Sequence, residues 1–323
     1  MLKVKIADDE IRIGKRFSVA FQRTLRIPDD GGTYPLPPGL GRFPLCRVAD
    51  FAAHVPADWR QRGGAFLPMY QREALWLAFD GASWKPNAVQ VGIGGINAIS
   101  GGAWDDGLSS DPQNYLVIPD QLWLDGINAG SGVIRQFVAM PLGTGTTVEA
   151  QLTGREEVGG IQIRVFEPKP GRFPDRPPPA EPEMMLESMS PMSPMAAGAM
   201  GLGAGGRMQQ KIYPDPYGLD TWDPTSSGEV FVHIVNSEQY EALTGHPPPP
   251  TPISAAAYTE HGLPWFELYD EAKGAVAASR RLAGVKSVRE KETERGEAKD
   301  EQPVKVRRRQ VRTIRPPGSG RKD

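Results

Sequence analysis

Apolar and polar residues alternate along most of the first 170 positions, which is the pattern of half-buried β-strands. The segment LKVKI (2–6) places apolar side chains at every second position, and RFSVAFQRTLRI (16–27) does so at Phe17, Val19 and Phe21. Further segments of this kind are AVQVGI, NYLVI, GVIRQFVAM, TTVEAQLTG and GGIQIRVFEP. Gly, Pro, Asn and Asp separate them. We therefore predict a mainly β domain over residues 1–172, folded as an antiparallel sandwich or a partly open barrel.

The alternation stops between residues 173 and 210. This stretch contains runs of proline, then seven of the ten methionines of the chain, and then a run of glycines. Such a composition offers little apolar surface in a regular pattern, so we predict a flexible linker. The methionines also suit an adaptable docking segment.

A second ordered region is predicted over residues 211–285, as a small mixed α/β module. Its strongest strand is GEVFVHIVN (228–236). A helix follows in SEQYEALTG, where Ser237 suits the N-cap and Gly245 the end of the helix. Residues 253–284 look mainly helical, with an interruption near Gly262 and Pro264. The polar composition of residues 286–323 predicts a disordered tail that becomes basic toward its end.

The charge is unevenly distributed along the chain. Residues 303–323 hold eight Lys or Arg against one Asp, a charge of +7, so the rest of the chain carries −2 − 7 = −9. No aromatic residue lies among these arginines. We therefore expect at most weak, non-specific nucleic-acid contact through residues 303–323.

Cysteine usage and hydropathy predict the compartment. Cys46 is the only cysteine, so the chain has no internal disulfide and no thiolate metal cluster. The first residues alternate apolar and charged side chains, unlike an export signal. Apolar runs are far shorter than the roughly 20 residues of a membrane helix. We expect a soluble cytoplasmic protein without a membrane span.

A glycine-rich segment, VGIGGINAISGG (91–102), is the first candidate for a nucleotide site. Its spacing is G-x-G-x-x-N, and glycines, a tryptophan and a proline follow where a dinucleotide fold needs a helix. We therefore predict no cofactor. The tetrapeptide GINA occurs at 95–98 and again at 126–129, which predicts two neighbouring strand ends.

Acidic residues gather in the loops that follow the glycine-rich segment. Together with one tryptophan they form the predicted ligand-binding rim of the β domain: Trp104, Asp105, Asp106, Asp111, Asp120 and Asp125. They suit either solvated turns or a metal or sugar site. The stretch DDGLSSDPQN lacks the register of a calcium loop, and the four histidines are unpaired in sequence. We predict no metal.

The stretch KIYPDPYGLDTWD concentrates aromatic side chains, and we predict Tyr213, Tyr217 and Trp222 as partner-binding residues, with another protein as the partner. The alternative is that this stretch packs back on the second module. Taken together, the residues favour a non-enzymatic binding or scaffold protein that acts through the rim loops. A hydrolase or carbohydrate-acting enzyme using carboxylates in 105–125 is the first alternative. A nucleic-acid-associated protein is the second.

Several stretches resemble a family of uncharacterised microbial and fungal proteins, some of which carry ubiquitin-like segments. The stretches are VIRQFVAMPLGTGTTVEAQLTGREEVGGIQIRVFEP, MGLGAGGRMQQKIYPDPYGLDTWD, FVHIVNSEQYEALTG and GLPWFELYD. The resemblance implies that residues 1–285 belong together. It implies no activity and no site residue.

Overall fold

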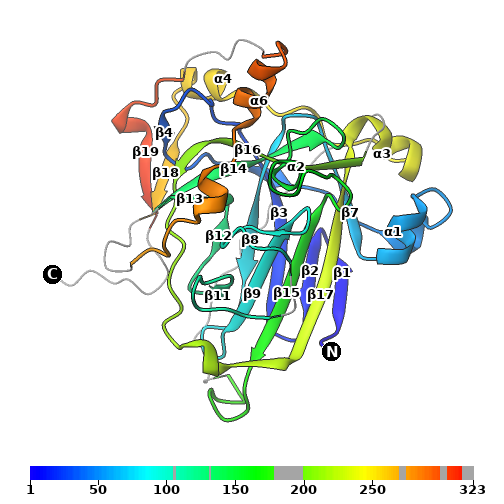
Figure 1. The fold of residues 1–323 in the computed structure, drawn as a ribbon, viewed down its shortest axis with the longest axis vertical. Coiled ribbons are helices and arrows are strands. Elements are labelled where there is room, and N and C mark those ends of the chain that lie inside the picture. Colours follow the sequence, from blue (N-terminus) through cyan, green and yellow to red (C-terminus); the bar gives the residue numbers. More distant parts are fainter. Residues whose placement is uncertain (105–106, 131, 178–198, 269–273, 299–303, 315–323) are drawn as a thin grey trace.

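The protein is mainly antiparallel β, as the alternation predicts. The computed structural model describes residues 1–104, 107–130, 132–177, 199–268, 274–298 and 304–314 (Figure 1). Seventeen strands belong to one large open sheet: β1 (Val4–Ala7), β2 (Glu10–Ile13), β3 (Phe17–Thr24), β4 (Thr33–Tyr34), β5 (Gly39–Arg42), β6 (Cys46–Arg47), β7 (Ala65–Met69), β8 (Ala74–Asp80), β9 (Asn87–Ile93), β10 (Ile96–Asn97), β11 (Leu116–Ile118), β12 (Trp123–Leu124), β13 (Gly126–Gly130), β14 (Val133–Pro141), β15 (Ile161–Pro168), β16 (Ala199–Gln209) and β17 (Trp222–Asn236).

The sheet folds over itself in two layers around one buried cluster. Strands β1, β2, β3 and β8 pair in that order, all antiparallel. Strands β9, β15 and β17 form the other layer, with β7 added in parallel at its side. In Figure 1 the blue strands β1–β3 lie behind the teal to yellow strands β9, β15 and β17. Alternate apolar residues of both layers, such as Val19, Leu77, Val91, Ile163 and Val232, are fully buried in the same cluster.

Strands β9 and β15 are buried on both faces, because loops cover the face that points away from this cluster. On that covered face Gln90 donates to the carbonyl of Gly107 over 2.8 Å, so its buried amide has a partner in the covering loop. The same covering brings the two GINA segments together, since the amide of Asn128 donates to the carbonyl of Ala98 over 2.9 Å. The predicted neighbourhood of these strand ends is confirmed.

The two layers are joined by β14 and β16, and part of the predicted linker is therefore wrong. Residues 199–209 form β16, which pairs with β14 along its length and with β17 at its start. Glycine is needed in β16 because other segments of the same chain approach its backbone closely. A Cβ atom on Gly203 would lie 2.9 Å from Val288, and one on Gly206 would lie 2.3 Å from the carbonyl oxygen of Pro28. Residues 178–198 of the predicted linker lie outside the described residues.

The strands of the second predicted module belong to the same sheet as those of the first. The strand predicted at 228–236 is part of β17, which pairs with β15 and β7. The sheet therefore runs across the predicted boundary at 172–211. The division into domains of 1–172 and 211–285 stays a prediction about folding units.

Short helices surround the sheet: η1 (Val48–Phe51), α1 (Ala57–Arg62), α2 (Val148–Thr153), η2 (Leu219–Thr221), α3 (Ser237–Thr244), α4 (Ala255–Glu260), α5 (Arg280–Ala283), α6 (Val288–Glu294) and η3 (Arg308–Gln310). The helix predicted after residue 236 is confirmed as α3, although Asn236 rather than Ser237 caps it. The mainly helical stretch predicted at 253–284 is wrong in its middle, where Trp265–Leu268 forms β18. None of the described helices is long and apolar enough to cross a membrane.

Much of the predicted disordered tail is folded against the core. Helix α6 buries Val288 in a cluster with Ala74, Val138 and Met140. Further along, β19 (Val311–Ile314) pairs in parallel with β18. Val304, Val306 and Val311 pack against the main buried cluster. These valines supply the apolar contacts that a disordered tail would lack. Residues 299–303 and 315–323 lie outside the described residues.

Candidate functional site

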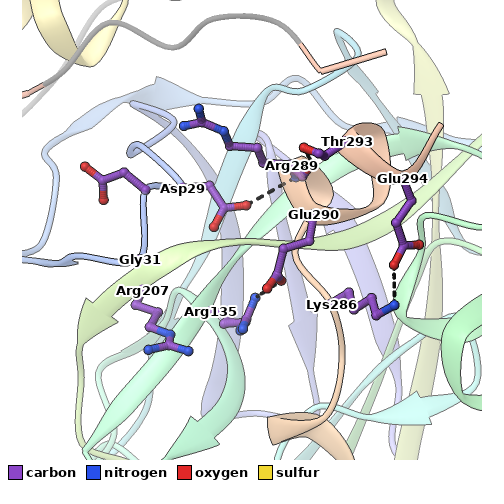
Figure 2. Close-up of a pocket in the computed structure, with 10 residues that line it drawn as sticks. Asp29, Gly31, Arg135, Arg207, Lys286, Arg289, Glu290, Thr293 and Glu294 are labelled. Carbon is purple, nitrogen blue, oxygen red and sulfur yellow. Dashed lines mark hydrogen bonds and ion pairs between the residues drawn. The ribbon is translucent and has the colours of Figure 1, made fainter. Parts of the chain in front are cut away.

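A charged cleft of about 600 Å³ opens where the loop at residues 29–31, strands β14 and β16 and helix α6 meet (Figure 2). This volume is in the range of small-molecule sites. Four cations and four carboxylates line it: Arg135, Arg207, Lys286, Arg289, Asp29, Asp30, Glu290 and Glu294. The cleft is therefore balanced in charge, and the arrangement of the charges decides what it can bind.

Two arginines from neighbouring strands lie side by side in the cleft. Arg135 of β14 and Arg207 of β16 are direct partners in the antiparallel register, and Figure 2 shows their guanidinium groups next to one another. Like charges directly opposite each other on paired strands destabilise a sheet. The arrangement therefore concentrates positive charge at one place.

The carboxylates of the cleft are occupied by other groups. Glu290 accepts from the amide of Ser287 over 2.6 Å, in the capping box that begins α6, and also from Arg135 over 3.3 Å. Asp30 accepts from the Tyr34 hydroxyl over 2.6 Å. Asp29 accepts from the amide of Arg289 over 3.2 Å. Glu294 accepts from Lys286 and from Lys291.

Arg207 differs from the other charged residues of the cleft. Its side chain is exposed, and its guanidinium makes no hydrogen bond or ion pair with any residue that the structure describes. Arg135 contributes only one long bond, to Glu290. The backbone bond from Ser287, followed by the attraction of Arg135, holds the pKa of Glu290 below its usual value. Burial instead raises the pKa of Asp29.

The predicted rim residues are not gathered in this cleft or in another single site. Asp105 and Asp106 lie outside the described residues. Trp104 packs on the outer face of the sheet, where its ring lies next to Gly92, beneath the guanidinium of Arg164 at 5.4 Å. Its indole nitrogen donates to Glu229 over 3.2 Å. Its ring is thus engaged by the strand below it.

The remaining rim acids lie in three different environments. Asp111 is exposed and Asp120 is half-buried, whereas Asp125 is 3% exposed. Asp125 accepts a hydrogen bond of 2.5 Å from the Gln210 amide, and burial raises its pKa to about 7. Within the described ranges, no three His, Cys, Asp or Glu side chains come together as a metal site. The described acids therefore do not build one constellation.

One of the predicted partner-binding aromatics, Trp222, binds a half-buried carboxylate, that of Asp215. Asp215 accepts from the Tyr115 hydroxyl over 2.5 Å and from the Trp222 indole over 2.9 Å. Trp222 and Tyr213 are buried, so only Tyr217 of the three predicted residues reaches the surface. The chain before this cluster is held by side-chain amides, since the amide of Tyr213 donates to Gln121. This stretch packs against Gln113, Tyr115 and Gln121, which belong to the predicted first domain, whereas its alternative interpretation placed it against the second module.

Sequence reasoning missed the cleft for two identifiable reasons. Arg135 lies inside the strand pattern GVIRQFVAM. A cation in a strand that is otherwise apolar indicates a charged partner or a functional site, because buried cations are rare. The predicted linker includes Arg207, although Met200, Leu202 and Ala204 repeat with the period of a strand. The glycines between them concealed that period. The contact with α6 joins residues far apart in sequence and has no local signal.

No protein-family model, no curated protein sequence and no solved structure matches this chain. The resemblance to uncharacterised microbial and fungal proteins receives no support from these comparisons. The chain is a mainly antiparallel β protein with a charged cleft between its sheet and a C-terminal helix.

Proposed function

We propose that this protein is a non-enzymatic binding protein, and that the charged cleft binds an anionic group, either a carboxylate or a phosphate. The observation that carries the proposal is the pair Arg135 and Arg207, opposed on neighbouring strands with the Arg207 guanidinium unpartnered among the described residues. A planar guanidinium offers two parallel donors to a carboxylate or phosphate. An anion between the two arginines would relieve their mutual repulsion.

Binding is favoured over catalysis by the state of the other polar groups in the cleft. Glu290 is committed to the start of α6 and to Arg135. The Thr293 hydroxyl donates to the carbonyl of Arg289 within the helix, over 2.8 Å. A catalytic base or nucleophile needs to be within reach of its substrate proton or atom, so groups that hold the helix together suit positioning better.

The proposed site differs from the ligand-binding rim that the sequence predicts in the loops after residue 102. The rim proposal depended on several acids converging beside Trp104, and the described acids are spread over an exposed, a half-buried and a buried position. The cleft instead has cations on two strands of a rigid sheet. A site built on strands holds its groups more precisely than one built on loops.

The test is a titration of the whole protein with inorganic pyrophosphate and, separately, with citrate, followed by calorimetry at low ionic strength. We expect Arg207→Ala to weaken binding by roughly tenfold to a hundredfold, the value of a charge-assisted hydrogen-bond pair. The control is Arg155→Ala, because Arg155 is an exposed arginine outside the cleft. The two anions separate a phosphate site from a carboxylate site.

Thermal unfolding without ligand supplies a second measurement. Removing one of two opposed cations should leave the melting temperature of Arg207→Ala equal to wild type or above it. A marked loss of stability would mean that Arg207 is a structural residue. The proposal would be refuted if wild-type protein bound neither anion. It would also be refuted if Arg207→Ala bound both anions as tightly as wild type does.

A further inference from the structure

A second, strongly basic cleft is formed by the C-terminal segment. It has a volume of about 460 Å³ and lies between the end of α4 and residues 304–310. Lys305, Arg307, Arg309 and His261 line it, against one carboxylate, Glu260. The other residues that line it are uncharged. Unlike the first cleft, this one carries a clear excess of positive charge.

The cations of this cleft are held in place by the apolar residues between them. Val304 and Val306 pack on the buried cluster, whereas Lys305 and Arg307 are exposed. Val304 to Arg307 thus alternate between a packed and an exposed side chain, and Arg308 and Arg309 follow in the turn η3. Gln310 fixes the end of the segment, because its buried amide donates to the carbonyls of Thr259, over 3.0 Å, and Leu263, over 3.4 Å.

These cations have no counter-ion in the described structure. The side chains of Lys305, Arg307 and Arg309 make no hydrogen bond or ion pair with any described residue. Arg308 and Arg312, which flank the cleft, are exposed in the same way. Five cations are therefore displayed on a folded segment of eight residues, and none of them forms an ion pair with a described carboxylate.

We propose that this surface binds the phosphate backbone of a nucleic acid. Several separated cations in a row suit a chain of phosphates better than a single ion. Four of the five are arginines, whose planar fork pairs with phosphate oxygens. A membrane surface is less well matched, since the cleft offers only Ala256 and Val304 as apolar contacts.

This proposal is independent of the anion site at Arg207, because no residue lines both clefts. It also differs from the weak tail contact that composition predicts. A disordered tail would bind through all of its charges equally, whereas a folded surface depends on the cations that it displays.

The experiment measures fluorescence anisotropy of a labelled 20-nucleotide oligothymidylate with the whole protein over a series of salt concentrations. The triple variant K305A/R307A/R309A should weaken binding by about tenfold or more and reduce the slope of log K against log salt by about 2, since each lost phosphate contact removes about 0.7. The charge-matched control is K3A/K5A/K15A, which removes three exposed lysines in and beside the N-terminal strands. It should bind like wild type.

A truncation after Ile314 separates the folded surface from the residues that follow. Most of the affinity should remain in the truncated protein, and the triple substitution should remove it there as well. The proposal is overturned if the triple variant binds like the control, or if truncation alone abolishes binding. It is also overturned if wild type ignores the oligonucleotide but binds vesicles of phosphatidylserine and phosphatidylcholine. Unchanged far-ultraviolet circular dichroism in each variant checks the fold.

Discussion

Replacing Asp125 by asparagine should change how the stability of this protein depends on pH. Asp125 lies between β12 and β13, is 3% exposed, and has Gln210 as its side-chain partner. No cation contributes to its pKa, which burial raises to about 7 from an ordinary 3.8. The folded protein therefore holds this proton more tightly than the unfolded chain does.

The sign and size of the effect follow from this difference. Between pH 4 and pH 7 the folded state binds more protons than the unfolded state, so this carboxyl makes stability fall as pH rises. Its contribution is fully present below pH 4 and is lost by about pH 7. A pKa of 7 against 3.8 corresponds to about 4 kcal/mol, because a tenfold change in proton affinity is worth about 1.4 kcal/mol.

Asparagine keeps the shape of the side chain and cannot ionise. We therefore expect Asp125→Asn to gain about 4 kcal/mol relative to wild type between pH 4 and pH 8, whatever constant cost the new amide adds. Urea unfolding at several pH values measures this difference. The control is Asp80→Asn, at the exposed end of β8. Parallel pH profiles for Asp125→Asn and wild type would show that the buried carboxyl does not titrate as described.

Three further predictions concern packing, titration and charge. Gly64→Ala should lower the free energy of unfolding by about 3 kcal/mol or more, because its Cβ would lie 2.0 Å from the carbonyl oxygen of Phe231. Gly63 also has a positive φ but has open space around it, so Gly63→Ala should lower the free energy of unfolding by about 1 kcal/mol in the same denaturant titration. Burial lowers the pKa of His233 to about 4 from 6.5, so the stability that the neutral ring contributes is present above pH 6.5 and is lost as pH falls toward 4. His233→Gln should remove about 3 kcal/mol of this loss of unfolding free energy between pH 6.5 and pH 4. An unchanged loss of stability in acid would contradict the prediction. Arg23→Ala should lower the free energy of unfolding by about 3–5 kcal/mol, because it leaves the buried carboxylate of Glu73 without its cation. Arg47→Ala breaks an exposed ion pair with Asp50 and should lower it by under about 1 kcal/mol. Equal losses in the two variants would contradict the role of burial.

The local pattern of the sequence was enough to predict the strands and their class of fold. Period-two alternation identified β3, β9, β14, β15 and the second half of β17, because a strand that faces a core must bury every second side chain. The repeat of GINA predicted two neighbouring strand ends, and the bond from Asn128 to Ala98 joins them. Helix α3 was visible from its polar start and its terminal glycine. These features depend on residues close together in the chain.

Composition misled where tertiary contacts decided the conformation. Glycines at 201–206 look like a linker in isolation, yet they form β16, because α6 and the chain at Pro28 approach the backbone too closely for a side chain. In VKVRRRQV the valines pack on the core and fold the segment despite its high charge, and only the last valine, Val311, belongs to a strand, β19. Pairing of β14 with β16 sets Arg135 opposite Arg207, and docking of α6 closes the cleft over them. Sequence alone determined where strands and charges occur in the chain, whereas only the tertiary structure decided which charges face one another, because that depends on register and on contacts between distant segments.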